Sequence, residues 1–78
     1  MKRLAKPFAV CVDNEGNEAS LIPGKVYRVH SDVRAAKDGL VRVTDESGED
    51  YLYDASQFVL VTFPQPVRRR LLALQRAS

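Results

Sequence analysis

Tryptophan is absent from this chain, and cysteine and histidine occur once each, as Cys11 and His30. A single cysteine cannot form a disulfide within the chain, and one cysteine with one histidine cannot supply the four ligands of a structural zinc site. The apolar run 8–12 is shorter than the roughly 7–15 residues of a secretory signal, and no run approaches the ~20 residues of a membrane span. These absences predict a cytoplasmic protein with no membrane segment, no disulfide and no metal or other cofactor.

The rest of the composition is that of one small folded domain. The 78 residues are 45% hydrophobic and 28% charged, which argues against a disordered chain. A chain of this length buries only about 60% of the surface that its unfolded form exposes. We therefore expect a modest core and marginal stability.

Five short segments carry the apolar alternation and the flanking turn residues that are typical of β-strands. In the first segment Phe8, Val10 and Val12 are expected to share the core face, which places Cys11 on the opposite face. The expected strands span residues 8–13, 25–30, 40–45, 50–54 and 58–63. In the strands that follow the first, the residues expected to share a face are Tyr27 with Val29, Val41 with Val43, and Tyr51 with Tyr53.

Turn residues fill the segments between these strands. Residues 31–39 are expected to hold one helical turn, with Ser31 or Asp32 as its N-terminal cap. Residues 46–49 are expected to form a hairpin, in which Gly48 supplies a positive φ at little cost because it has no Cβ.

The composition changes after residue 63. Pro64 and Pro66 cannot continue a strand ladder, and residues 67–78 have the apolar spacing of a short helix. The apolar stripe of this helix is Val67, Leu71 and Leu74, flanked by Arg68, Arg69, Arg70 and Arg76. The sequence thus predicts an all-β fold, a small five-stranded antiparallel SH3-like barrel over residues 1–63. A Pro-containing linker and a short basic amphipathic helix then occupy residues 64–78.

A resemblance supports this fold. The motifs that carry it are Leu21-x-x-Gly24-Lys25-x-Tyr27-x-Val29, Val43-x-Asp45-x-x-Gly48-Glu49, and Tyr51-x-Tyr53 followed by Phe58. Through them, residues 8–63 resemble small bacterial and bacteriophage proteins of unknown function with SH3-like barrels. The resemblance implies a one-turn helix before the last strand and a phage or prophage origin. It implies no binding of PxxP peptides, because the chain has no tryptophan and lacks the acidic loop pattern of eukaryotic SH3 domains.

The chain shows no set of residues typical of catalysis. His30 is followed directly by Ser31 and Asp32, and sequence neighbours seldom converge into a nucleophile–base–orienter set. Residues 13–18 carry three carboxylates but lack the ligand spacing and the closing glutamate of a calcium loop. We therefore expect a protein that is not an enzyme.

Charge is segregated along the chain. Residues 1–7 carry three basic residues and no acid, and residues 64–78 carry four arginines and no acid. Residues 8–63 carry five basic and ten acidic residues, a net charge of −5. An acidic domain with two basic ends is therefore predicted.

Two functions fit this layout. In the first, the protein is a binding module for another protein, and its C-terminal helix packs on the barrel, on a second copy or on a partner. In the alternative, the basic ends bind nucleic-acid phosphates and exposed tyrosines stack on bases. The acidic barrel disfavours the alternative because it repels the same ligand. The candidate binding residues are Tyr27, Tyr51, Tyr53, Arg68, Arg69 and Arg70, although the tyrosines fit a core lining as well as an exposed platform.

Overall fold

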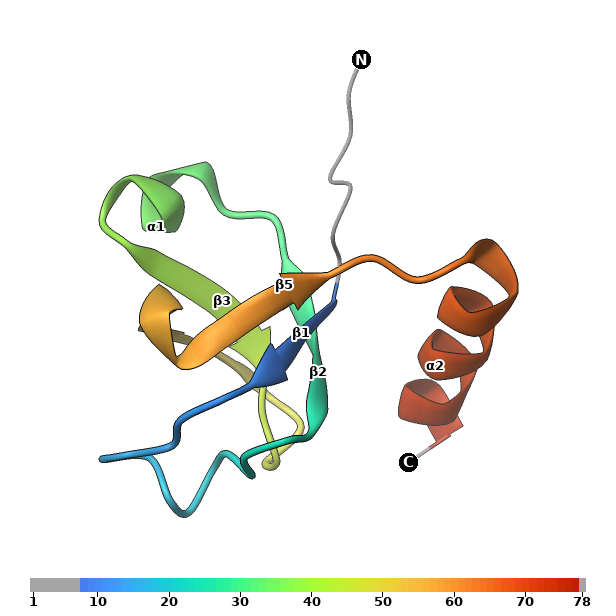
Figure 1. The fold of residues 1–78 in the computed structure, drawn as a ribbon, viewed down its shortest axis with the longest axis horizontal. Helices are drawn as coiled ribbons and strands as arrows, with labels where there is room; N and C mark the ends of the chain where they lie inside the picture. The colour runs from blue at the N-terminus through green and yellow to red at the C-terminus, as the bar shows by residue number, and fades with distance from the viewer. Residues whose placement is uncertain (1–7, 78) are drawn as a thin grey trace.

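The computed structural model of the protein describes residues 8–77, and the side chains of residues 8–74. These residues form one five-stranded antiparallel sheet, two short helical elements and a C-terminal helix (Figure 1). The strands are β1 (Phe8–Cys11), β2 (Val26–His30), β3 (Leu40–Thr44), β4 (Asp50–Asp54) and β5 (Phe58–Val61). The helical elements are α1 (Val33–Lys37), the 3₁₀ turn η1 (Ala55–Gln57) and α2 (Gln65–Ala77). The predicted basic N-terminal end, residues 1–7, lies outside the described residues.

The strand order is β4-β3-β2-β1-β5, so the first strand lies between the second and the last. Phe8 is paired with Arg28 of β2 on one side and with Val61 of β5 on the other. The sheet begins and ends at β4 and β5, which do not pair with each other. The antiparallel sheet with a C-terminal helix is therefore present, and the closure of this sheet into a barrel is not shown.

Local sequence signals explain the connections. The Asp32 side chain caps α1 by accepting a hydrogen bond from the Ala35 N–H at 2.9 Å. Gly48 has φ +87° in the hairpin between β3 and β4. η1 occupies the step between β4 and β5, where the Asp54 side chain caps it. The predicted helical turn, hairpin and one-turn helix are all confirmed.

The core lies on one face of the curved sheet, where three aromatic rings meet. Tyr27 and Tyr53 both pack edge-on against Phe58, with ring centroids 6.3 Å and 6.1 Å away. Small and β-branched residues fill the space around the rings. The buried cluster is Ala9, Cys11, Leu21, Tyr27, Val29, Val43, Tyr53 and Phe58.

The predicted orientation of β1 is wrong. Ala9 and Cys11 face the core and are fully buried, whereas Val10 is half-buried and Val12 is exposed. The reason is volume: the aromatic rings already fill the interior, so the strand turns its small side chains toward them. Phe8 lies on the other face, where the Phe63 ring covers it at a centroid distance of 5.7 Å.

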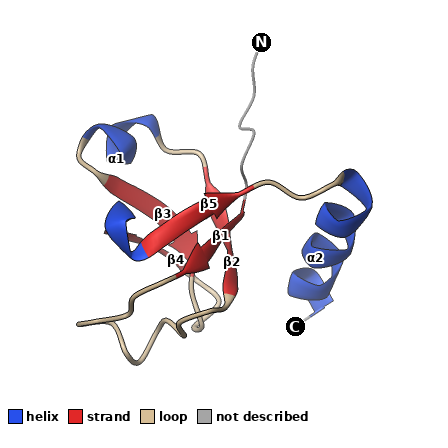
Figure 2. Ribbon diagram, viewed as in Figure 1, coloured by secondary structure: helices blue, strands red, loops and turns tan. Residues whose placement is uncertain are grey.

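α2 begins at Gln65, two residues earlier than predicted. Pro66 lies in its first turn, where a missing N–H costs nothing because no intrahelical acceptor exists there. The Arg68 N–H donates to the Pro64 carbonyl at 2.9 Å and closes that turn. Figure 2 shows α2 standing apart from the sheet, on the side away from α1.

This separation leads to a prediction on truncation. A chain that ends after Pro64 should retain a cooperative thermal unfolding transition, because the buried cluster lies entirely within residues 9–58. Circular dichroism of the truncated and full-length proteins measures the effect. A truncated protein without a cooperative transition would show instead that α2 belongs to the core.

Candidate binding surface

The structure separates the three tyrosines that the sequence offers as a binding platform. Tyr27 and Tyr53 are 3% and 7% exposed, and their rings lie in the core. Tyr51 is 51% exposed and its hydroxyl donates to Glu49. Because only one ring is accessible, the three tyrosines do not form a stacking surface together.

The buried tyrosine hydroxyls are held by two adjacent carboxylates of the β3–β4 hairpin. Tyr53 donates to Asp45 Oδ2 at 2.5 Å and lies 2.9 Å from Ser20 Oγ. Burial of Asp45 raises its pKa, but the hydrogen bonds from Ser47 and Tyr53 outweigh this and hold the pKa below its usual range. Burial and the bond to Asp45 raise the pKa of Tyr53.

Glu46 makes the second of these contacts. It accepts hydrogen bonds from Lys25 Nζ at 2.6 Å and from the Tyr27 hydroxyl at 2.5 Å. These two bonds lower the pKa of Glu46, while burial and the same carboxylate raise the pKa of Tyr27. The hydroxyls are thus engaged in fixing the hairpin to the core and are not free to contact a ligand.

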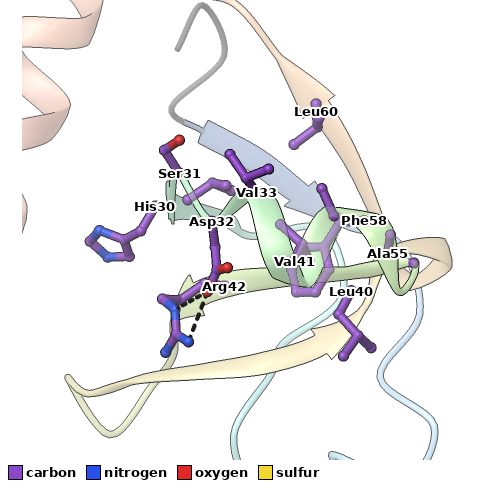
Figure 3. A pocket seen from close by; sticks show the side chains of 13 residues that line it. His30, Ser31, Asp32, Val33, Leu40, Val41, Arg42, Ala55, Phe58 and Leu60 are labelled. Atoms are coloured by element: carbon purple, nitrogen blue, oxygen red, sulfur yellow. Dashed lines mark hydrogen bonds and ion pairs between the residues drawn. The ribbon is translucent and has the colours of Figure 1, made fainter. Parts of the chain in front are cut away.

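An apolar pocket opens between α1, β3 and β5 (Figure 3). It has a volume of about 450 Å³, and the core residues Val29 and Phe58 line it. Val33 of α1, Val41 of β3 and Leu60 of β5 surround it, and Phe58 lines its inner wall. Val33 and Leu60 are 74% and 47% exposed, so large apolar side chains remain accessible at its mouth.

Polar side chains line one side of the apolar pocket. Arg42 makes two contacts with Asp32 Oδ2, from Nε at 2.9 Å and from Nη2 at 2.8 Å. The N-terminal hydrogen bond of α1 and the Arg42 side chain lower the pKa of Asp32. His30 Nε2 lies 2.6 Å from Thr44 Oγ1, and burial followed by the charge of Arg28 lowers the His30 pKa. The Asp32–Arg42 pair and the His30–Thr44 hydrogen bond thus form a polar side of the apolar pocket whose groups already have partners.

An acidic pocket of about 350 Å³ lies across η1 from the apolar pocket. Asp13, Glu15 and Asp54 are among the residues that line it, and no basic residue lines it. Its floor is ordered by Gln57, whose side chain donates to the Glu15 carbonyl and accepts from Asn17. Ala55 of η1 lines the apolar pocket, whereas Ser56 and Gln57 line the acidic one, so the two pockets adjoin at this turn.

The predicted arginines lie away from both pockets. Arg69 and Arg70 are exposed on α2 and Arg68 is half-buried, with its Nη2 donating to Gln65 Oε1 at 2.7 Å. Val67 and Leu74 of the same helix are 42% and 62% exposed. The structure therefore does not bring the arginines together with Tyr27, Tyr51 or Tyr53.

Sequence reasoning missed both pockets. The apolar pocket joins residues between Val29 and Arg42, from β2 through α1 to β3, with Ala55, Phe58 and Leu60. The sequence pattern places these residues in the expected strands and in the turns between them. The available signal was the run 58–61, in which every residue is apolar although an edge strand needs only one buried face.

The described residues 8–77 hold no group of three or more His, Cys, Asp and Glu side chains placed to bind a metal ion. Within the same range, no helix has the length and apolar character required to cross a bilayer. No protein-family model, no curated protein and no solved structure matches this chain.

Proposed function

We propose that this protein is a small, non-enzymatic binding module that recognises a basic amphipathic segment of another protein at the surface around η1. The observation that carries the proposal is the apolar pocket with an acidic pocket beside it. Apolar side chains of the ligand enter the first pocket, and its lysine or arginine side chains face the second. Apolar anchors with a charged rim are the usual composition of a protein-binding site.

The strand order supports an SH3-like barrel as the framework of this module. A meander of four strands with the first strand paired to the last, and a 3₁₀ turn before that last strand, agrees with the resemblance in the turn glycines and aromatics. A cytoplasmic location and a phage or prophage origin belong to the same proposal. We favour a module over an enzyme because the sequence shows no set of residues typical of catalysis.

Nucleic-acid binding is the second candidate. It is favoured by α2, whose described side chains include three arginines and no carboxylate, and which stands away from the acidic sheet. Four phosphate contacts would give a slope of about −3 to −4 in log K against log salt for duplex DNA. The net charge of −5 over residues 8–63 opposes this binding, so we place it second.

A matched pair of substitutions in β5 tests the proposed function. Leu60 lines the apolar pocket and the adjacent Val59 points to the opposite face, and the two are similarly exposed at 47% and 52%. Peptides selected on the protein from a random display library should carry apolar residues next to lysine or arginine. Leu60→Glu should weaken their binding by about tenfold or more, and Val59→Glu should leave it within about twofold.

Fluorescence titration measures the binding of the labelled peptides, and the same titration with labelled duplex DNA at physiological salt provides the comparison. Micromolar binding of DNA that is lost when Arg68, Arg69 and Arg70 become alanine would favour the second candidate. Peptides that bind both β5 variants equally would show that the apolar pocket is not the binding site.

A further inference from the structure

α2 carries an apolar stripe that the described residues leave largely exposed, since Val67 and Leu74 are 42% and 62% exposed. Val67, Leu71 and Leu74 recur at intervals of four and three residues, which places them within about 60° of one another around the helix. Arg68 and Arg70 lie on either side of this stripe. An apolar stripe this narrow is typical of a helix that packs into a groove or against another helix.

The features of α2 match the surface around η1. The stripe supplies three aliphatic side chains for the apolar pocket, and the flanking arginines supply positive charge for a pocket lined by Asp13, Glu15 and Asp54. The same complementarity holds for whole segments, because residues 8–63 carry a net charge of −5 and residues 64–78 a net charge of +4. α2 is thus a basic amphipathic segment of the kind that the proposed function requires.

In this structure α2 does not lie on the apolar pocket of its own chain, because none of its described residues lines that pocket. Only residues 62–64 join the two elements, and they span at most about 10 Å when extended. The Phe63 ring packs on Phe8 at 5.7 Å and fixes the direction in which the chain leaves the sheet. Figure 1 shows α1 and α2 on opposite sides of the sheet.

We infer that α2 of one copy occupies the surface around η1 of a second copy, and that the exchange is reciprocal. The stripe of Val67, Leu71 and Leu74 enters the partner's apolar pocket, and the arginines face its acidic pocket. A symmetric pair makes each contact twice, so the two dockings reinforce each other. This inference rests on the proposed function because it uses the same surface, and it names the segment that fills it.

Adjacent leucines in α2 provide the test on the helix side. Leu71 belongs to the stripe, whereas Leu72 lies about 130° away from its centre, and both are half-buried. Light scattering after size exclusion at micromolar concentration should give the wild type twice the mass of one 8.7 kDa chain. Leu71→Glu should weaken association by about tenfold or more and so give the mass of a monomer at the same concentration, whereas Leu72→Glu should leave the association unchanged. Circular dichroism checks that both variants keep their helix content.

Val33→Glu provides the test on the pocket side. Val33 is 74% exposed at the start of α1, where an acidic residue is tolerated, so the variant should fold. It should be monomeric, as should Leu71→Glu. The Val33→Glu protein keeps an intact helix, and the Leu71→Glu protein keeps an intact pocket. A mixture of the two should therefore form a heterodimer with one intact contact, weaker than the wild-type dimer.

Three results would overturn the inference: a wild-type mass of one chain throughout the micromolar range, equal disruption by Leu71→Glu and Leu72→Glu, or a Val33→Glu variant that remains dimeric. The last would indicate pairing of α2 with α2. The proposed function has its own test, which uses the Leu71→Glu protein and its double variant with Leu60→Glu. If display peptides bind the Leu71→Glu protein but not the double variant, the proposed function stands whichever of the three results is found. Absence of pocket-dependent peptide binding to the Leu71→Glu protein would refute the proposed function itself.

Discussion

Replacement of Tyr53 by alanine is expected to lower the free energy of unfolding by about 3–5 kcal/mol, the typical cost of truncating a buried aromatic residue. The Tyr53 ring is 7% exposed and packs against Phe58, and its hydroxyl holds the carboxylate of Asp45. A domain of this size has a total stability of about 4–12 kcal/mol. Tyr53→Ala therefore removes a large part of that stability, and urea denaturation at neutral pH measures it.

Tyr51→Ala is the matched control. Tyr51 lies on the same strand and the same face as Tyr53 but is 51% exposed, so its truncation should cost about 0.5 kcal/mol or less. Tyr53→Phe keeps the ring and loses the bond to Asp45, and should cost about 1–3 kcal/mol. His30→Ala, which loses one hydrogen bond to Thr44, should cost about 1 kcal/mol. A small effect of Tyr53→Ala, equal to that of Tyr51→Ala, would contradict the central place of Tyr53 in the core.

Asp45→Asn is expected to cost about 1.5–3 kcal/mol at neutral pH, because charge-assisted hydrogen bonds are lost in a buried site. The Asp45 carboxylate is 6% exposed and accepts bonds from the Ser47 N–H at 2.9 Å, from the Ser47 hydroxyl and from Tyr53. Asp13→Asn, an exposed change in the acidic pocket, should cost about 0.5 kcal/mol or less. Urea midpoints of the three proteins make the comparison.

The pH dependence of this difference has a definite sign. The pKa of Asp45 in the folded protein lies below its usual value, so the unfolded chain takes up the proton first as the pH falls. The stability that Asp45 contributes is complete above the ordinary aspartate pKa of about 3.9 and is lost as the pH falls through the lower, folded value. The gap between wild type and Asp45→Asn should therefore narrow below about pH 4. A gap that stays constant down to pH 3 would mean that the charge of Asp45 does not stabilise the fold.

Much of the fold follows from local sequence. The five strands, the capped turn at Asp32, the hairpin at Gly48 and the 3₁₀ turn before Phe58 appear where turn residues and apolar alternation place them. These signals act over a few residues, through φ preference, side-chain capping and the period of two in a strand. The C-terminal helix was predicted for the same reason, with an error of two residues because a proline is tolerated in a first helical turn.

Tertiary packing determines the orientation of β1 and whether each tyrosine is buried or exposed. Every residue of Phe8–Cys11 is apolar, so alternation alone does not show which face of β1 is turned to the core. The volume left beside the aromatic rings determines that face. Tyr51 and Tyr53 are equivalent in the sequence pattern. Only the packing of Phe58 against Tyr53, and the position of Tyr51 beside the hairpin, made one buried and the other exposed.

The sequence by itself determined the strands, their turns, the separation of an acidic domain from a basic helix, and the apolar stripe of that helix. The tertiary structure decided where a binding surface lies, because the apolar pocket forms only when α1, β3 and β5 come together and leave Leu60 and Val33 uncovered. It also decided that α2 stands apart, through the packing of Phe63 on Phe8. Local signals set elements within a few residues, whereas a pocket depends on the distances between elements that are far apart in the chain.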